Sequence, residues 1–305
     1  MNYKIILIGI FLPALVNATY IEEINNCGTI VPLESASRIV SLNQQVTEAL
    51  IAINADNKLL GGAYRDDKPA KKWEKRFKNI KNLSKEYPNK ELLLMMKPDL
   101  LIAGFSSAYS NWGVGSRETW KSRNVNTYLF SSGCKRNEFN LEVFFNDMEN
   151  LGKLTDNEDN ANKWIVKQRA RLENLKKHDN KRKPKILLWL REYDIPYVAG
   201  CCGTGNFIIK EVGGINIAED LPKQWGHLSW EAIIKRQPDL IVMVNSNWSS
   251  FEQKKKYLQE NQLFELLKAV QKQSYLSISF SEAVPGVRII DGIEKLSYLI
   301  GEGKL

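Results

Sequence analysis

Aromatic and arginine side chains recur on the loops that follow predicted strands. Aromatic rings stack on flat conjugated ligands, and arginines pair with anionic oxygens. These residue types therefore predict noncovalent binding of a catechol, tetrapyrrole or flavin-like ring. The residues that we single out are Asn43, Gln44, Tyr64, Arg65, Tyr109 and Trp112 in the first half of the chain, and Arg191, Tyr193, Trp225, His227, Trp248 and Arg288 in the second.

Each of these residues also has a structural interpretation. A loop tryptophan can cover the core, and a loop arginine can bind backbone carbonyls. His227 could ligate an iron, although a single histidine more often serves as a hydrogen-bond donor. Trp189 lies inside a predicted strand, so we assign it to the core.

Two glutamates, Glu91 and Glu231, occupy matching positions in a segment that occurs twice. The two copies read Glu-Leu-Leu-Leu-Met-Met-Lys-Pro-Asp-Leu-Leu-Ile and Glu-Ala-Ile-Ile-Lys-Arg-Gln-Pro-Asp-Leu-Ile-Val. Asn89 and Ser229 stand two places earlier and predict helix N-caps, the proline ends the helix, and an apolar strand follows. The repeat predicts two similar α/β lobes that present one glutamate each on an equivalent surface. Alternatively, each acid only complements the positive end of its helix, an effect of about 0.3–1 kcal/mol.

Motifs typical of catalysis are absent. The sequence contains no Gly-x-Ser-x-Gly, no His-Glu-x-x-His and no Walker loop. Gly203-Thr204-Gly205 could bind a phosphate in front of a helix, but a tight turn is the simpler interpretation. We expect a protein that is not an enzyme. An exported α/β hydrolase remains an alternative, because Ser, His and Asp need not be adjacent in sequence.

Four cysteines and two histidines limit the disulfide and metal chemistry. We favour a disulfide between Cys27 and Cys134, which both lie in the first half. The adjacent Cys201 and Cys202 could form a vicinal bridge, stay reduced or line a pocket. Without a Cys-x-x-Cys and with so few histidines, we expect no metal site and no resident cofactor. A chaperone for bare metal ions remains a remote alternative.

The pattern of strands and helices must position these residues. Strands alternating with helices predict parallel sheets whose ligand-facing loops lie at the carboxyl ends of the strands. Residues 224–227 are expected to form an aromatic loop. Between the lobes, helical periodicity begins at Leu141, and Thr155-x-x-Glu158 predicts a capping box for a second helix over about 156–178. That helix would be about 34 Å long and would act as a strut.

We therefore expect an α/β protein with two similar lobes, each a small mostly parallel sheet flanked by helices, joined by one long rigid helix. The predicted divisions are residues 19–142 for the N-terminal lobe, 143–178 for the connecting helices and 179–305 for the C-terminal lobe.

The first eighteen residues have the pattern of a signal peptide. Lys4 precedes an apolar run over residues 5–12, and Val16-Asn17-Ala18 is a small-residue cleavage site. The run is shorter than the roughly 20 apolar residues of a membrane-spanning helix. We expect cleavage after Ala18 and an exported, soluble protein. The net charge of the full chain, +8, then serves solubility or attracts an anionic ligand, and does not indicate nucleic-acid binding.

The mature sequence resembles the substrate-binding proteins of ABC importers for ferric siderophores, haem and cobalamin. The matching segments are Arg38-Ile-Val-Ser-Leu, Thr47-Glu48-Ala-Leu, Glu91…Pro98-Asp99-Leu, Leu151-Gly152, Tyr197-Val-Ala-Gly200, Gly213-Gly214-Ile-Asn216 and Ser229-Trp230-Glu231…Pro238-Asp239-Leu-Ile-Val. A subgroup whose proposed cargo includes a deazaflavin cofactor precursor is similar at Asn26-Cys27-Gly28, Gly200-Cys-Cys-Gly203 and Pro285-Gly286-Val287-Arg288.

The resemblance implies a periplasmic monomer that holds its ligand in the cleft between the lobes. It implies delivery to an ABC permease dimer in the inner membrane, whose arginines would receive Glu91 and Glu231. The expected ligand is a ferric siderophore or similar metal chelate, and cobalamin, haem and a deazaflavin precursor are the alternatives.

Overall fold

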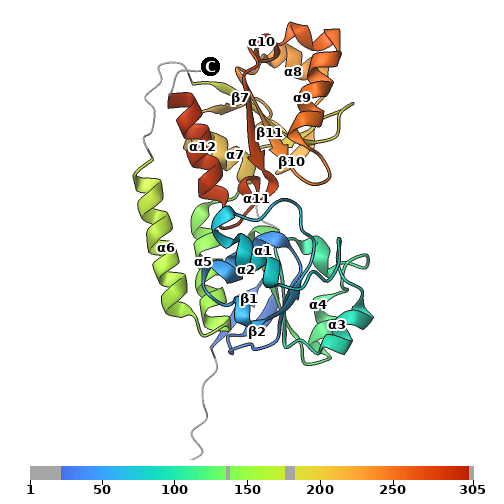
Figure 1. The fold of residues 1–305 in the computed structure, drawn as a ribbon, viewed down its shortest axis with the longest axis vertical. Coiled ribbons are helices and arrows are strands. Elements are labelled where there is room, and N and C mark those ends of the chain that lie inside the picture. The colour runs from blue at the N-terminus through green and yellow to red at the C-terminus, as the bar shows by residue number, and fades with distance from the viewer. Residues whose placement is uncertain (1–21, 135–137, 176–182, 302–305) are drawn as a thin grey trace, which may run out of the picture.

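A computed structural model describes residues 22–134, 138–175 and 183–301. The predicted signal peptide, residues 1–18, lies outside the described residues. Within them, no helix has the length and apolar character needed to cross a membrane. The chain forms two α/β lobes, one below the other in Figure 1, with two helices along one side.

The N-terminal lobe is built on a parallel sheet with the strand order β4-β3-β5-β6. These strands are almost entirely buried, which explains why they read as short apolar runs and not as alternating patterns. The strands are β3 (Ile39–Ser41), β4 (Leu59–Gly62), β5 (Leu100–Ala103) and β6 (Asn126–Leu129). The helices are α1 (Gln44–Ala52), α2 (Glu74–Asn79), α3 (Lys90–Met96) and α4 (Arg117–Lys121). An antiparallel hairpin of β1 (Glu23–Asn26) and β2 (Thr29–Pro32), absent from the predicted elements, precedes them.

The C-terminal lobe has a mixed sheet with the order β10-β8-β7-β11-β12, and the short β9 pairs with β7. The central β11 is parallel to both of its neighbours, whereas β8 is antiparallel to β7 and β10. The strands are β7 (Lys185–Arg191), β8 (Tyr197–Ala199), β9 (Ile215–Asn216), β10 (Trp225–His227), β11 (Leu240–Asn245) and β12 (Tyr275–Ser279). The helices are α7 (Thr204–Glu211), α8 (Trp230–Arg236), α9 (Phe251–Glu260), α10 (Lys268–Gln271), α11 (Phe280–Ala283) and α12 (Ile289–Gly301).

Two α/β lobes with mostly parallel sheets confirm the predicted fold class. The expectation of a loop over residues 224–227 is wrong, because Trp225–His227 form an edge strand paired with β8. A three-residue strand that carries a glycine between two aromatic residues gives no clear alternation in sequence.

The connecting helices are α5 (Leu141–Leu154) and α6 (Glu158–Glu173). The predicted capping box is wrong, because the Thr155 hydroxyl donates back to the Leu151 carbonyl at 2.6 Å and closes α5 instead. The second helix is also shorter than predicted, since it ends at Glu173 and its 16 residues span about 24 Å.

Helix α6 nevertheless links the two lobes. It packs along α5 and extends beside α12, as Figure 1 shows. Near its end, Arg171 forms ion pairs with Asp291 at 2.6 Å and with Glu294 at 2.5 Å, both on α12. These contacts tie the connecting helix to the C-terminal lobe.

The two copies of the repeated segment adopt the same local structure. Helices α3 and α8 begin at Asn89 and Ser229, whose side chains accept backbone N–H groups at 2.8 Å and 3.3 Å. Both helices end in a left-handed residue, Lys97 with φ of 47° and Gln237 with φ of 48°. The aspartate that follows each proline accepts the backbone N–H that opens a neighbouring strand segment, Arg38 at 3.0 Å in one lobe and Lys185 at 2.8 Å in the other.

Glu91 and Glu231 lie in the first turns of these two helices and are exposed. The repeat thus places one carboxylate at an equivalent position on each lobe.

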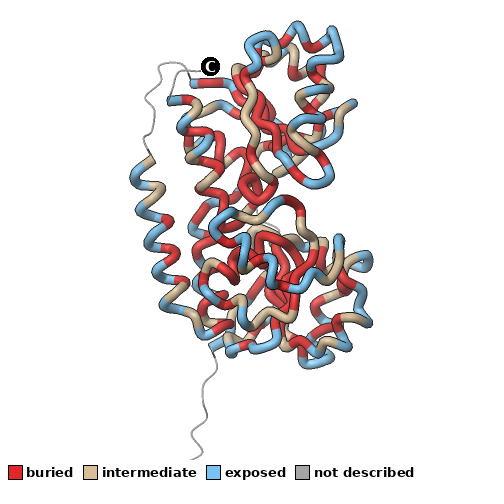
Figure 2. Tube along the Cα trace, viewed as in Figure 1, coloured by how far each residue is buried: buried red, intermediate tan, exposed pale blue. Residues whose placement is uncertain are grey.

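The lobes share one core and one buried polar joint. Buried residues run through both sheets and along α5 (Figure 2), and a single apolar cluster includes Phe144 of α5, Ile208 of α7 and Ile293 of α12. In the joint, the buried guanidinium of Arg288 forms ion pairs with Glu48 of α1, at 2.9 Å, and with Asp67.

Other residues of the joint donate hydrogen bonds to the Asp67 carboxylate. This carboxylate accepts from Gln44 at 2.7 Å and from the backbone N–H and hydroxyl of Ser281 at 2.7 and 2.9 Å. Residues 44, 48 and 67 belong to the N-terminal lobe, and 281 and 288 to the C-terminal lobe, so the network fixes one lobe against the other.

The joint makes a prediction about the pH dependence of stability. Burial raises the pKa of Glu48 to about 7, although Arg288 lowers it. The pKa of a glutamate in the unfolded chain is about 4.3, so between these values the folded state retains a proton that the unfolded state has released. The contribution of Glu48 is therefore fully present below about pH 4.3 and is lost as the pH rises through 7.

Glu48→Gln removes this titration. The free energy of unfolding of each protein is measured by urea denaturation from pH 4.5 to 8. It should fall less with rising pH for the variant than for the wild type, and the two declines should differ by up to about 3 kcal/mol. Glu91→Gln, which changes an exposed glutamate, is the control and should parallel the wild type. Parallel curves for Glu48→Gln and the wild type would contradict the assignment.

Candidate functional site

A cleft of about 1610 Å³ opens between the lobes. Its walls come from loops at the strand ends of both sheets, as expected for parallel α/β architecture. From the N-terminal lobe the lining residues are Tyr64, Arg65, Asp66, Asn82, Lys85, Glu86, Tyr87, Phe105, Ser106, Ser107, Ser132, Gly133 and Cys134. From the C-terminal lobe they are Leu190, Arg191, Tyr197, Cys201, Cys202, Pro222, Lys223, Gln224, Trp225, Asn247, Trp248, Phe280 and Val284.

Aromatic pairs form large parts of both walls. In the N-terminal lobe, the rings of Tyr64 and Tyr87 have their centroids 4.8 Å apart. In the C-terminal lobe, Tyr197 stacks on Trp225 with an angle of 24° between the ring planes. The stacked pair gives the cleft a flat apolar surface that matches a conjugated ring, and the Tyr64 and Tyr87 rings, tilted by 51°, add apolar contact area.

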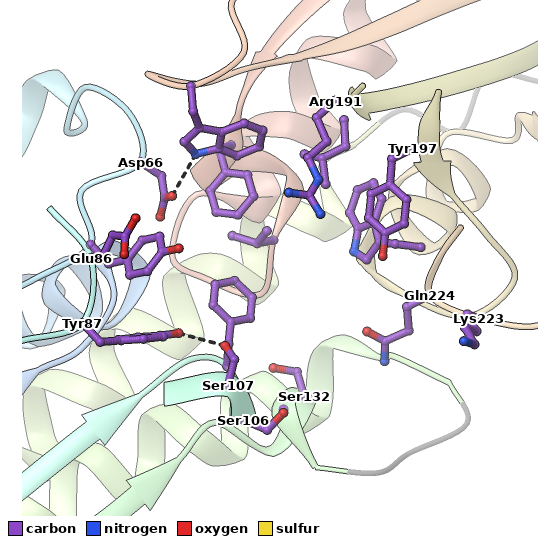
Figure 3. A pocket seen from close by; sticks show the side chains of 18 of the residues that line it. Asp66, Glu86, Tyr87, Ser106, Ser107, Ser132, Arg191, Tyr197, Lys223 and Gln224 are labelled. Atoms are coloured by element: carbon purple, nitrogen blue, oxygen red, sulfur yellow. Dashed lines mark hydrogen bonds between the residues drawn. The ribbon is translucent and has the colours of Figure 1, made fainter. Parts of the chain in front are cut away.

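Charged side chains line both sides of the cleft. In Figure 3, Asp66 and Glu86 lie on one side, and Arg191 and Lys223 lie on the other. The Arg191 guanidinium also lies 5.1 Å from the centre of the Tyr197 ring, a distance that suits a cation–π contact. Arg65 and Lys85 also line the N-terminal wall, so the cleft carries four cationic and two acidic side chains.

A contact between the lobes closes one side of the cleft. The backbone N–H of Asn247 donates to the Asp66 carbonyl at 2.7 Å, and the indole of Trp248 donates to the Asp66 carboxylate at 3.2 Å. The loop that carries Asn247 and Trp248 is held from behind by the buried Lys254, whose ammonium donates to Val244 at 2.7 Å and to Ser249 at 2.8 Å.

Five of the twelve side chains predicted to contact a ligand line this cleft: Tyr64, Arg65, Arg191, Trp225 and Trp248. The guanidinium of Arg65 is already engaged inside its own lobe. It donates to the Ile80 carbonyl at 2.6 Å and packs on the Phe77 ring, so it offers little charge to a ligand.

Four others are structural groups inside the protein. Gln44 and Arg288 belong to the buried joint, where their polar atoms meet Glu48 and Asp67. Asn43 is fully buried and caps the loop after β5 by accepting the Gly104 N–H at 2.9 Å. The Tyr109 hydroxyl donates to the Leu101 and Tyr128 carbonyls at 2.8 and 3.1 Å and does not reach the cleft.

The remaining three lie outside the lining of the cleft. Tyr193 packs on Trp189 in the aromatic core of the C-terminal lobe. His227 is exposed on β10 and pairs with Glu192, so it is not placed to ligate an iron in the cleft. Trp112 is exposed and packs against the outer side of Tyr87, with the ring centroids 5.3 Å apart.

Sequence reasoning missed several lining residues. Tyr197 lies within a strand, and a search of loops alone overlooks it. Tyr87 and Lys223 lie in irregular segments that precede helices or strands. Asp66 follows Tyr64 and Arg65 in the loop after β4, so its position agrees with a site residue. A single loop aspartate nevertheless carries no distinctive sequence signal.

Two disulfides border the cleft. One joins Cys27 to Cys134 within the N-terminal lobe, the pairing favoured from sequence, and the other joins the adjacent Cys201 and Cys202. Cys134, Cys201 and Cys202 all line the cleft. Among the described residues, no three His, Cys, Asp or Glu side chains converge in a way that could hold a metal ion.

The two disulfides should differ in their effect on stability. Cys27 and Cys134 are separated by 107 residues, whereas Cys201 and Cys202 are neighbours. A disulfide stabilises by constraining the unfolded chain, and more so for a longer loop, so Cys27→Ser/Cys134→Ser should lower the free energy of unfolding by about 2–5 kcal/mol. Cys201→Ser/Cys202→Ser is the matched variant and should change it far less. Equal losses in chemical denaturation would contradict this account.

Comparisons with known proteins place the chain in a family. The profile of the periplasmic binding protein family matches residues 39–278. A vitamin B12-binding protein of Vibrio cholerae serotype O1 is 25% identical over 241 residues, which cover 76% of this chain and 81% of that protein. A crystal structure of a periplasmic binding protein from Veillonella parvula is 25% identical and covers 92% of this chain and 97% of its own, with a TM-score of 0.81.

A protein of an Fe3+-hydroxamate transport system from Saccharomonospora viridis shares the fold. It superposes with a TM-score of 0.78 at 16% identity, over 93% of this chain and 100% of its own. The family match covers both lobes, including the strands that carry the cleft and both copies of the repeat. The chain belongs to the periplasmic binding protein family.

Proposed function

We propose that this protein is the exported binding component of an ABC importer and that its cleft captures a corrinoid of the cobalamin type. The observation that carries the proposal is the cleft of about 1610 Å³ with aromatic surfaces on both walls. Sites for drug-sized ligands occupy about 300–1,000 Å³, so this cleft suits a considerably larger molecule.

The chemistry of the walls agrees with a corrinoid. Such a ligand has a flat conjugated macrocycle whose edge carries neutral amide side chains. The stacked Tyr197–Trp225 pair offers a flat surface to the macrocycle, and the tilted Tyr64 and Tyr87 rings add apolar contact. Amides need donors and acceptors in equal measure, and the cleft supplies carboxylates, hydroxyls and cationic groups. The similarity to vitamin B12-binding proteins supports the same ligand class.

A ferric siderophore, first among the ligands expected from sequence, is the second candidate. The observation in its favour is the basic side of the cleft, where Arg191 and Lys223 would pair with anionic oxygens of a chelate. On the wall of the N-terminal lobe, Asp66 and Glu86 would repel the oxygens of a siderophore, although Lys85 lines the same wall. Haem is a third candidate: no histidine is among the described residues that line the cleft, but tyrosine also ligates haem iron, and Tyr64, Tyr87 and Tyr197 line it.

The proposed partner is a membrane permease that receives Glu91 and Glu231. Both carboxylates are exposed in the first turn of a capped helix, and the same cap, helix and left-handed terminus recur in each lobe. A helix needs no such match between lobes for its own stability, whereas a two-subunit permease would present two equivalent receptor sites.

Binding of cyanocobalamin tests the ligand class. Isothermal titration calorimetry of the mature protein should show saturable binding at one site, in a panel with ferric hydroxamate and catecholate siderophores, haemin and a deazaflavin. Trp225→Leu removes half of a stacked aromatic wall and should weaken cyanocobalamin binding by about tenfold to a hundredfold.

Trp112→Leu is the control, because this exposed tryptophan does not line the cleft. It should leave the affinity within about threefold of the wild type. Binding of a siderophore with no response to cyanocobalamin would replace the corrinoid by the second candidate. Silence across the panel would refute both.

Charge reversal tests the docking role. Glu91→Arg combined with Glu231→Arg should reduce uptake of labelled cyanocobalamin through the cognate permease at least tenfold, because like charges would then meet at the docking surface. The affinity of the purified protein for cyanocobalamin should not change. Glu173→Arg, an exposed reversal at the end of α6, is the control and should transport normally. A folded double variant with normal uptake would refute the assignment.

A further inference from the structure

The carboxylate of Asp66 is incompletely satisfied where it meets the cleft. The residue is 3% exposed and lines the cleft in the loop after β4. Its Oδ1 accepts the Trp248 indole N–H at 3.2 Å. Its Oδ2 is buried, and no donor within the described ranges reaches it. Figure 3 shows the carboxylate at the edge of the cleft, beside the indole that binds it.

The neighbouring Asp67 provides a contrast. Its oxygens accept from Gln44, Ser281 and Arg288, which makes it a fully partnered group of the joint. In the part of the chain that the structure describes, no cation is paired with the Asp66 carboxylate. The Asn247 N–H fixes the backbone carbonyl of Asp66, so the residue is held in place while one of its carboxylate oxygens lacks a hydrogen-bond donor from these described residues. A buried acceptor without a donor lowers stability, by about 1–3 kcal/mol for a typical group, unless a bound molecule supplies the donor.

The burial has an electrostatic consequence that agrees with this geometry. Desolvation raises the pKa of Asp66 to about 7, and the Trp248 hydrogen bond only partly opposes it. A carboxylate under this strain gains from any N–H group that reaches it from the cleft. The basic residues Arg191 and Lys223 lie on the opposite side and do not serve it.

We propose that Asp66 is a specificity-determining residue that accepts the N–H of an amide side chain of the ligand. This inference rests on the proposed corrinoid function and adds to it the polar group that selects amides over carboxylates on one edge of the macrocycle. The Trp248 indole positions the carboxylate, and the ligand amide meets that carboxylate where Asp66 lines the cleft. Above about pH 7, where Asp66 is ionised, an edge that carries a carboxylate in place of the amide meets a like charge and is rejected.

Cyanocobalamin, its monocarboxylic acids and one substitution test the proposal. Mild acid hydrolysis of cyanocobalamin converts single peripheral amides to carboxylates, and the separated monocarboxylic acids are the probes. The wild type should bind one of these isomers at least tenfold more weakly than cyanocobalamin. Asp66→Asn keeps an acceptor for Trp248 but presents N–H to the ligand, so it should weaken cyanocobalamin binding by about tenfold to a hundredfold. The same variant should bring the affinities of that isomer and of cyanocobalamin to within about threefold of each other.

The ratio of the two affinities separates recognition from general damage to the fold. Asp159→Asn, an exposed change on α6, is the control and should retain the discrimination of the wild type. If the wild type binds cyanocobalamin and Asp66→Asn leaves both the affinity and the ratio unchanged, the role of Asp66 is refuted while the proposed function stands. If the wild type binds neither cyanocobalamin nor its acids, the proposed function fails and this inference fails with it.

Discussion

The buried ion pairs of Arg288 with Glu48 and Asp67 are the constraint on which the rest of the structure depends. They join helix α1 and the loop after β4 to the segment that precedes α12, and they lie beside an apolar cluster shared by both lobes. Charges removed from water stay stable only when each meets an opposite charge or a hydrogen bond. One lobe cannot therefore leave the other without exposing unpaired charges. This constraint favours a cleft whose width is largely fixed before the ligand arrives.

The same loop supplies both the joint and the cleft. Asp67 points into the joint, while Asp66, one residue earlier, meets the cleft and the Asn247–Trp248 loop of the other lobe. A short segment thus fixes the separation of the lobes and places a carboxylate at the lining of the cleft. Aromatic walls from both lobes provide area, and polar groups at the sides provide selection, a division that is common in sites for large ring-bearing ligands.

The repeated segment was the most informative part of the sequence. Its cap, glutamate, proline and apolar run predicted two equivalent helix–strand units. The structure contains both units, and each helix ends in a left-handed residue, Lys97 in one lobe and Gln237 in the other. The fold class followed from this repeat and from the apolar strands. The start of α6 could not be predicted reliably, because a threonine hydroxyl serves equally well as a helix N-cap or as a partner for the preceding carbonyls, and Thr155 does the latter. The site was less predictable, since Gln44 and Arg288 have the polar character of ligand contacts but turn toward the joint. Tertiary packing, which the local sequence does not encode, decides which way a loop side chain points.

A crystal structure of the mature protein grown with cyanocobalamin tests the central claim most directly. The account predicts one corrinoid between the lobes, with its macrocycle against the Tyr64–Tyr87 and Tyr197–Trp225 pairs and a peripheral amide within hydrogen-bonding distance of the Asp66 carboxylate. The lobes should keep the separation set by the Arg288 joint. A corrinoid bound elsewhere on the surface, or a cleft that stays empty at saturating ligand, would contradict the account.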